Sequence, residues 1–97
     1  MHVIARKTLK DFWERHSDAE QPLRAWFTES TSSIWHGPAD IKSRYPTASF
    51  LNDNRVVFNI KGNRYRLVVH VRYDLGRVYI RFVGTHAEYD RINAVTV

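Results

Sequence analysis

The chain contains no cysteine, and it has only one methionine, three prolines and four glycines among its 97 residues. Because cysteine is absent, disulfide bonds, thiolate metal ligands and cysteine nucleophiles are all excluded. No apolar run approaches the roughly 20 residues that a membrane-spanning helix needs. Charged residues interrupt the first ten positions, where a signal peptide would carry its apolar segment. We therefore expect a cytoplasmic protein that does not use a membrane.

Several motifs of enzyme sites are also missing. The five histidines are scattered, and no pair of them stands at ligand spacing with a carboxylate partner. No serine has the context of a nucleophile elbow, and no glycine-rich loop resembles a phosphate cradle. The sequence therefore predicts neither a metal site nor a cofactor.

The composition is that of one folded domain. Hydrophobic residues make up 43% of the chain, charged residues 26% and aromatic residues 13%, which is typical of a globular protein and not of a disordered one. A chain of 97 residues has room for one core but not for two. We expect a single domain that spans residues 1–97.

Residues 54–83 alternate strictly between apolar and polar side chains, which predicts strands with one buried face. Lys61-Gly62-Asn63 and Asp74-Leu75-Gly76 interrupt the alternation with turn chemistry at hairpin spacing. The pattern therefore predicts a three-stranded antiparallel meander. Its core face is expected to hold Val56, Phe58, Ile60, Tyr65, Leu67, Val69, Val71, Val78, Ile80 and Phe82.

The opposite face of this meander is strongly basic. Between Asn54 and Gly84 there are seven lysines and arginines against one acid, whereas residues 1–53 carry no net charge. Phosphates and stackable bases are the natural partners of cations set among aromatic rings. A merely solvated surface is the alternative, since arginine on the exposed face of a sheet also keeps sheet edges from pairing. The side chains expected on this face are Arg64, Arg66, His70, Arg72, Arg77, Tyr79 and Arg81.

The remaining segments are expected to support this sheet. Residues 1–5 form an apolar edge strand, and 8–35 show the helical spacing of an antiparallel hairpin with an aromatic stripe. Residues 47–53 have the character of a loop, the tail 92–97 is weakly specified, and 84–91 form a terminal motif with capping-box spacing. We predict an α+β fold with two N-terminal helices on one face of a small, mainly antiparallel sheet and a short C-terminal helical turn.

The terminal motif brings proton-transfer groups close to the basic strands. Metal-free RNA cleavage needs a group that takes the 2′-OH proton, a group that protonates the leaving 5′-oxygen, and cations for the charge on the phosphate. His86 and Tyr89 are candidates for the proton transfers. The simpler alternatives are a turn hydrogen bond for His86 and a core position for Tyr89. Lys61, Arg66 and Arg81 are candidates for charge stabilisation.

Two segments resemble a known family. They are Asn59-Ile-Lys-Gly-Asn-Arg-Tyr-Arg-Leu67 and Tyr79-Ile-Arg-Phe-Val-Gly-Thr-His-Ala-Glu-Tyr-Asp90, and the opening Met1-His2-Val3-Ile4 also fits. Together they resemble the HigB-type toxins of the RelE/ParE-like superfamily. The resemblance implies a small toxin with two N-terminal helices over an antiparallel sheet. It also implies metal-independent cleavage of mRNA on translating ribosomes, and neutralisation by a HigA-like helix-turn-helix antitoxin encoded beside the toxin.

The residues and the resemblance together define the predicted site. The catalytic candidates are His86, Arg81, Arg66 and Tyr89, and the RNA-binding candidates are Lys61, Arg64, Arg72, Arg77 and Tyr79. Two other functions are also compatible with the sequence. One is a toxin of the same fold that poisons DNA gyrase without nuclease chemistry, and the other is a non-catalytic RNA-binding module.

Overall fold

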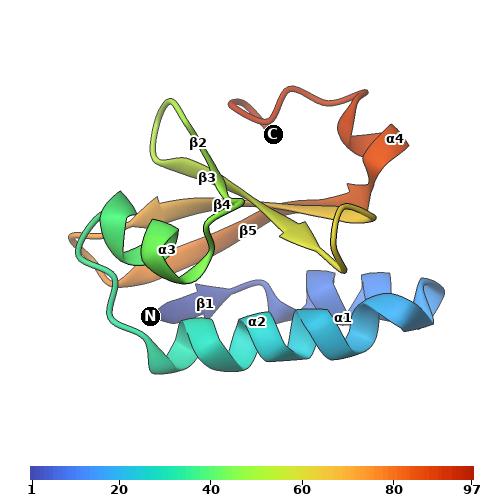
Figure 1. The fold of residues 1–97 in the computed structure, drawn as a ribbon, viewed down its shortest axis with the longest axis horizontal. Coiled ribbons are helices and arrows are strands. Elements are labelled where there is room, and N and C mark those ends of the chain that lie inside the picture. Colours follow the sequence, from blue (N-terminus) through green and yellow to red (C-terminus); the bar gives the residue numbers. More distant parts are fainter.

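A computed structural model describes all 97 residues as one α+β domain, in which helices cover one face of a five-stranded sheet (Figure 1). The sheet has the strand order β1-β5-β4-β3-β2, and all neighbouring strands except β1 and β5 are antiparallel. The predicted fold class is therefore confirmed. The elements are β1 His2–Ile4, α1 Arg6–Arg15, a 3₁₀ turn Ser17–Ala19, α2 Glu20–Ser32, α3 Pro38–Arg44, β2 Ser49–Leu51, β3 Arg55–Ile60, β4 Tyr65–Arg72, β5 Arg77–Thr85 and α4 His86–Tyr89.

The hairpin turns between the three central strands have the backbone geometry that their sequences favour. Lys61 and Gly62 both have positive φ angles, 52° and 63°, between β3 and β4. Gly76, with a φ of 65°, serves the same purpose between β4 and β5. Glycine adopts this left-handed region without a steric penalty, so each turn ends one strand and reverses the chain.

The two outer strands show where the sequence pattern was less informative. β1 runs parallel to β5, with Val3 opposite Val78. The expectation of a loop over 47–53 was wrong, because this segment contains β2, which pairs antiparallel with β3. Asp53 and Asn54, in the three-residue loop between Leu51 and Arg55, reverse the chain with positive φ angles of 62° and 56°, a region that Asn and Asp tolerate in turns.

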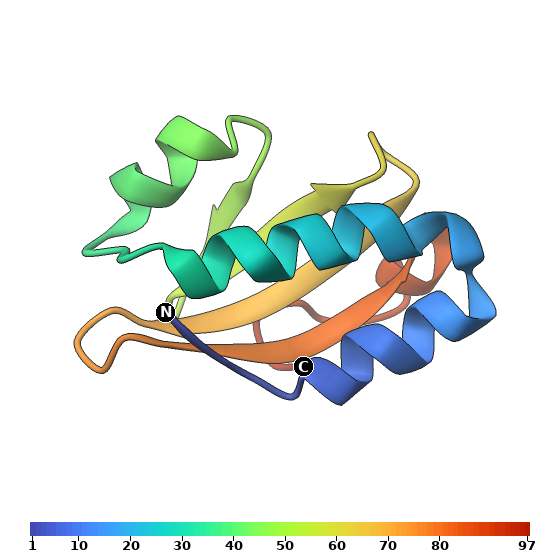
Figure 2. The same ribbon diagram turned by 90° about the horizontal axis from the view of Figure 1, so that it is seen from below.

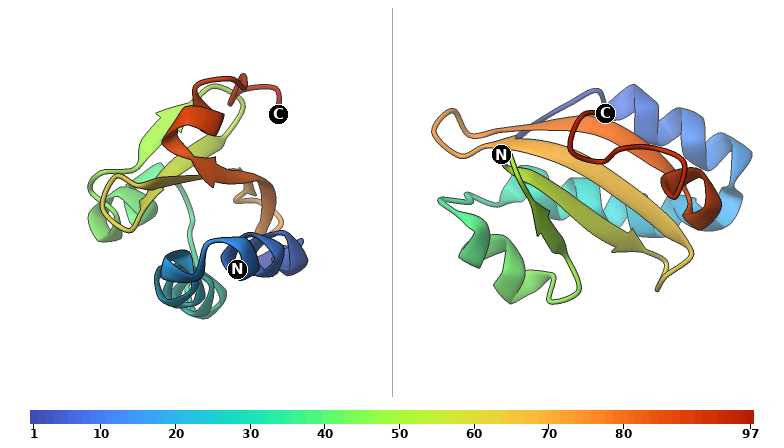
Figure 3. Two further views of the ribbon diagram at one scale, coloured as in Figure 1. Left: turned by 90° about the vertical axis from the view of Figure 1, so that its right-hand side faces the viewer. Right: turned by 90° about the horizontal axis from the view of Figure 1, so that it is seen from above.

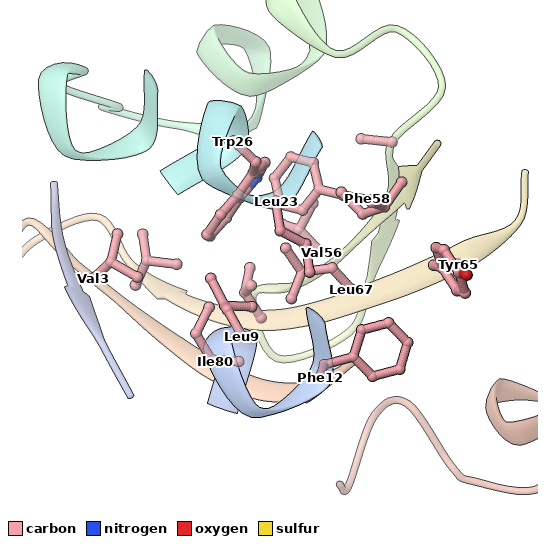
Figure 4. Close-up of a cluster of buried hydrophobic side chains, with 14 of the residues drawn as sticks. Val3, Leu9, Phe12, Leu23, Trp26, Val56, Phe58, Tyr65, Leu67 and Ile80 are labelled. Atoms are coloured by element: carbon pink, nitrogen blue, oxygen red, sulfur yellow. The ribbon is translucent and has the colours of Figure 1, made fainter. Parts of the chain in front are cut away.

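The helices α1 and α2 lie side by side across the sheet (Figure 2). The hairpin predicted over 8–35 is made of two helices that begin at Arg6 and end at Ser32, so residues 33–35 lie outside it. Leu9 and Phe12 from α1 and Leu23 and Trp26 from α2 are almost fully buried. They pack against side chains of the central strands such as Phe58 (Figure 4). Burial of each large apolar side chain stabilises the fold by about 1.5–3 kcal/mol.

A bulge in β5 changes the face to which its last residues point. Val69 pairs with Ile80 but Val68 pairs with Phe82, so Arg81 is an extra residue with no partner in β4. The assignment of Phe82 to the main core face was therefore wrong. Phe82 lies instead on the opposite face, against the cluster around Val57 and Val68. Bulges of this kind shift side chains between faces and increase the local strand twist.

The C-terminal tail covers part of the face that was expected to be open. It lies across the strands on the side away from α1 and α2 (Figure 3). Ala94 is buried with Val57 and Val68, and Ile92 and Val97 pack against them. Arg55 is only 7% exposed beneath the tail and donates a hydrogen bond to the main-chain oxygen of Val97. This basic residue therefore belongs to the interior and not to a surface that binds RNA.

We expect Gly84→Ala to destabilise the domain by about 1–3 kcal/mol, because a methyl group at this position overpacks its surroundings. A Cβ atom would lie 2.5 Å from Cζ of Phe82 and 3.1 Å from Oε1 of Glu88. Urea denaturation should therefore give a lower midpoint than for the natural chain. Gly37→Ala is the matched control, since a Cβ atom there has no neighbour within 4 Å. Equal midpoints for both variants would contradict the close packing of Phe82 over Gly84.

Candidate active site

Arg66 and His86 come together at the end of the sheet where β4 begins and β5 ends. Arg66 is the second residue of β4 and pairs with Gly84, so the first residue after β5 reaches its side chain. Nη2 of Arg66 lies 2.9 Å from Nε2 of His86. Two catalytic candidates that are 20 positions apart in the chain are therefore in direct contact.

The contact with Arg66 selects one tautomer of the neutral histidine. A guanidinium group has only donors, so Nε2 of His86 is the acceptor and its proton resides on Nδ1. Nδ1 lies 3.5 Å from Oδ2 of Asp90. Asp90 is the C-cap residue of α4, one helical turn after His86. The Asp90 carboxylate thus lies on the Nδ1 side of the ring, and the Nε2 lone pair faces Arg66. The histidine side chain is 48% exposed, so a ligand can reach it.

Arg66 is held from three sides. Its Nη1 donates hydrogen bonds to the side-chain oxygens of Asn59 and Asn63, and its Cζ lies 5.7 Å from the centroid of the Tyr89 ring. The predicted site did not include Asn59, Asn63 or Asp90. Asn59 could have been predicted from the register of the β3–β4 hairpin, since it stands opposite Arg66. Asp90 could have been predicted as a partner of His86 from their i,i+4 spacing, which places two side chains on the same face of a helix.

The short helix α4 is fixed by a complete capping box, as the spacing of Thr85 and Glu88 predicted. The main-chain N–H of Thr85 donates to Oε1 of Glu88 at 2.8 Å, and the N–H of Glu88 donates to Oγ1 of Thr85 at 3.2 Å. The hydrogen bond from the Thr85 main chain lowers the pKa of Glu88. Glu88 is therefore an ionised structural group that orients the turn carrying His86.

Lys61 and Arg64 lie beside the β3–β4 turn and face the helical layer. Nε of Arg64 is 3.2 Å and Nζ of Lys61 is 3.9 Å from Oδ2 of Asp18. A hydrogen bond from Tyr65, with the two cations, lowers the pKa of Asp18. One carboxylate therefore offsets part of the positive charge of this pair, although Arg64 is 65% exposed and Lys61 is 49% exposed.

Arg81 and Tyr79 form a separate group further along β5. The guanidinium of Arg81 is exposed and lies 5.5 Å from the centroid of the Tyr79 ring. The ring of Tyr79 is 6.3 Å from that of His70 in the adjacent strand. Burial, together with the positive charge of Arg55, lowers the pKa of His70. His70 is therefore neutral at pH 7, and this group offers one cation beside two aromatic faces.

Arg72 and Arg77 stand at the far end of the sheet from Arg66. They face each other across the β4–β5 hairpin. Six residues of extended strand separate Arg66 from Arg72, which corresponds to about 20 Å. Arg72 is also engaged with Asp74 through two contacts of 3.1 Å and 2.9 Å. The predicted site residues are therefore distributed over several places, and of the four catalytic candidates Arg66, His86 and Tyr89 meet while Arg81 stands apart.

Comparison with known proteins gives a consistent result. Residues 19–92 match the HigB toxin family, described as the RelE-like toxic component of a toxin–antitoxin system. The mRNA interferase toxin HigB of Escherichia coli K12 and the mRNA interferase HigB of Shigella flexneri are each 34% identical to this chain over 97 residues, covering 98% of it and 93% of the relative. The mRNA interferase HigB of E. coli O6:H1 is 19% identical over 94 residues, covering 95% of this chain and 91% of the relative.

Two further observations concern features that the site and the fold do not contain. The chain has no group of three or more histidine, aspartate and glutamate side chains that could hold a metal ion. None of its helices has the length and apolar character to cross a membrane.

The family match covers most of the chain and confirms the resemblance of the two sequence segments. The chain belongs to the HigB toxin family, the RelE-like toxic components of toxin–antitoxin systems.

Proposed function

We propose that this protein is the toxin of a type II toxin–antitoxin system and acts as a metal-independent endoribonuclease. It cleaves mRNA on translating ribosomes and is neutralised by a HigA-like antitoxin. The names of its relatives support the activity. The observation that carries the proposal is the chain of contacts from Asp90 through His86 to Arg66, because it joins a proton acceptor to a phosphate-binding cation.

In this reaction the 2′-oxygen of the RNA attacks the adjacent phosphorus and the bond from phosphorus to the 5′-oxygen breaks. His86 accepts the 2′-OH proton at Nε2, and the Asp90 carboxylate stabilises the imidazolium that forms. Arg66 moves its donors from His86 to the phosphate oxygens when RNA binds. This exchange frees Nε2 for proton transfer and stabilises the charge on the phosphorane. The products are a 2′,3′-cyclic phosphate and a 5′-hydroxyl end.

The other residues of the site have supporting roles in this proposal. The Tyr89 hydroxyl protonates the leaving 5′-oxygen, since the ring lies beside the Arg66 guanidinium. Arg81 is a second cation for phosphate, about 10 Å along β5 from Gly84. Tyr79 and His70 offer aromatic faces on which a neighbouring base stacks. Lys61 and Arg64 contact the RNA backbone on the opposite side of the Arg66 and His86 pair.

We expect RNA affinity to fall steeply with salt, because each phosphate contact releases counterions. Four contacts, from Lys61, Arg64, Arg66 and Arg81, correspond to a loss of roughly 50-fold between 50 and 200 mM salt for a single strand. Fluorescence anisotropy with a labelled, uncleavable 2′-deoxy oligonucleotide measures this slope. A nearly flat dependence would contradict binding through phosphates and favour a protein target such as gyrase.

The activity itself is tested by inducing the chain in cells and mapping the 5′ ends of mRNA. New 5′ ends within coding regions are expected in growing cells, and they should be lost when initiation of translation is blocked. A chain that stops growth without producing new 5′ ends is not an endoribonuclease. Cleavage that persists after translation is blocked would contradict the ribosome-dependent part of the proposal.

A further inference from the structure

Arg66 is held by neutral amides and not by a carboxylate. Its Nη1 donates to Oδ1 of Asn59 and to Oδ1 of Asn63. Arg72, at the other end of the same strand, is instead bound by the carboxylate of Asp74 at 2.9 Å, which offsets part of its charge. A neutral acceptor orients a guanidinium group without offsetting its charge. The full charge of Arg66 is therefore left for an anion.

The fold brings the two amides to Arg66 from different elements. Asn59 stands opposite Arg66 in the pairing of β3 with β4, and Asn63 lies exposed in the turn that joins these strands. Asn59 is half-buried, and its Nδ2 donates to the main-chain oxygen of Thr47 at 3.4 Å, so its Oδ1 faces Arg66. The arginine is thus held at the end of the sheet where the β3–β4 turn and α4 lie close together (Figure 1).

A guanidinium group has five N–H donors, and the contacts of Arg66 divide them between an anchored end and a free end. The two donors of Nη1 are directed at Asn59 and Asn63, and one donor of Nη2 is directed at Nε2 of His86. The Nε–H and the second Nη2–H have no acceptor within the protein. A phosphate oxygen can therefore approach Nε and Nη2 while Nη1 keeps its partners.

We propose that Asn59 and Asn63 are positioning residues of the cleavage reaction. They anchor Nη1 of Arg66, so that Nε and Nη2 meet the phosphate in a fixed orientation and with their full charge. This inference rests on the function proposed above. A preoriented cation stabilises the charge of the phosphorane without reorganisation during the reaction, whereas a misplaced cation loses much of this effect. Both asparagines act through Arg66 and do not contact the reacting atoms themselves.

Two substitutions separate the orientation that an asparagine provides from its neutrality. Asn63→Ala removes the acceptor and leaves the charge of Arg66 unchanged, whereas Asn63→Asp keeps an acceptor of the same shape and adds a negative charge beside it. Asn59→Ala repeats the first change from the strand. Asn52→Ala and Asn52→Asp are the matched controls, because Asn52 is exposed in the loop between β2 and β3, at the other end of β3.

Three quantities are measured for each variant. NMR of the guanidinium N–H groups, recorded without RNA, reports whether rotation of Nη1 is hindered, and the Arg66 signals are assigned by their loss in Arg66→Lys. Fluorescence anisotropy gives the affinity for an uncleavable 2′-deoxy oligonucleotide. Single-turnover cleavage of mRNA by saturating toxin in a translation extract gives the rate after binding.

We expect Asn59→Ala and Asn63→Ala to free the rotation of Nη1 and to cleave about tenfold more slowly, with an affinity within about twofold of the natural value. Asn63→Asp should keep Nη1 hindered but bind the oligonucleotide about tenfold more weakly, which is the scale of one charge-assisted hydrogen bond. Both Asn52 variants should behave like the natural chain.

The proposal is overturned if both alanine variants at Asn59 and Asn63 cleave at the natural rate, or if their Nη1 signals are unchanged. It also fails if Asn63→Asp binds no more weakly than Asn52→Asp, because the neutrality of the acceptor then has no effect. An affinity loss in the alanine variants as large as that in Asn63→Asp would make the asparagines direct RNA contacts and contradict a positioning role. If the natural chain cleaves no mRNA, the proposed activity fails, whereas NMR and anisotropy still decide whether neutral amides anchor Arg66 for an anion.

Discussion

Arg66→Ala is expected to slow mRNA cleavage about a hundredfold and to abolish growth inhibition on induction. Loss of one cation aimed at the charge of a phosphorane raises the barrier by about 3 kcal/mol. Arg66 is partly exposed on a strand and contacts only side chains of the site, so its loss leaves no cavity in the main core. Single-turnover cleavage of a labelled mRNA in a translation extract measures the rate.

Two comparisons give this result its meaning. Lys10→Ala removes the same charge from the exposed side of α1 and should cleave at the natural rate. Arg81→Ala should also lose growth inhibition, because Arg81 is exposed beside Tyr79 on the same face of the sheet. If Arg66→Ala and Arg81→Ala both cleave at nearly the natural rate, the active site lies elsewhere on the protein.

The central strands could be predicted from the sequence because the burial pattern and the turn residues specified the same strand boundaries. Alternation from Val56 to Ile80 specified one buried face, and the positive φ angles fell at Lys61, Gly62 and Gly76, inside or beside the predicted turns. The aromatic residues Phe12 and Trp26 stood at helical spacing and needed an apolar surface. Local propensity and packing therefore agreed over these elements.

The features that the sequence did not predict have one physical origin, because each of them is determined by contacts between segments that are distant in the chain. The bulge at Arg81 shifts Phe82 to the second face, and no local signal distinguishes it from continuous alternation. β2 is only three residues long and is defined by its partner β3. The tail is specified by Val57 and Val68 beneath it. Single-sequence periodicity contains none of these contacts.

The same limit applies to the candidate site. Composition identified a basic sheet, but the structure divides its charges among different partners. Asp18 faces Lys61 and Arg64, and Asp74 binds Arg72. The charges that remain uncompensated are those at Arg66, Arg77 and Arg81, and among them only Arg66 contacts the candidate base His86. Net charge therefore predicts an anionic partner, while the pairing of β4 with β5 determines which of the candidate residues meet.

The second large effect is expected at His86. His86→Gln should abolish cleavage, because an amide does not titrate near pH 7 and cannot accept the 2′-OH proton. The glutamine oxygen can still accept from Arg66, so α4 and the RNA contacts should persist. We expect loss of single-turnover cleavage with the affinity for an uncleavable 2′-deoxy oligonucleotide within about twofold of the natural value, as phosphate contacts dominate binding.

Neighbouring variants separate proton transfer at His86 from a structural role. Tyr89→Phe removes the hydroxyl that protonates the leaving 5′-oxygen and keeps the ring beside Arg66, so it should slow the reaction less than His86→Gln, because water can supply this proton to the leaving oxygen in its place. Asp90→Asn keeps a hydrogen-bond acceptor at Nδ1 but removes the charge that stabilises the imidazolium. Because loss of this charge disfavours protonation of the imidazole, the acidic limb of the pH–rate profile should move to lower pH, whereas a purely structural role would lower the rate equally at every pH. If His86→Gln and Tyr89→Phe both cleave normally, or if His86→Gln unfolds the domain, His86 is a turn residue and the base must be sought elsewhere.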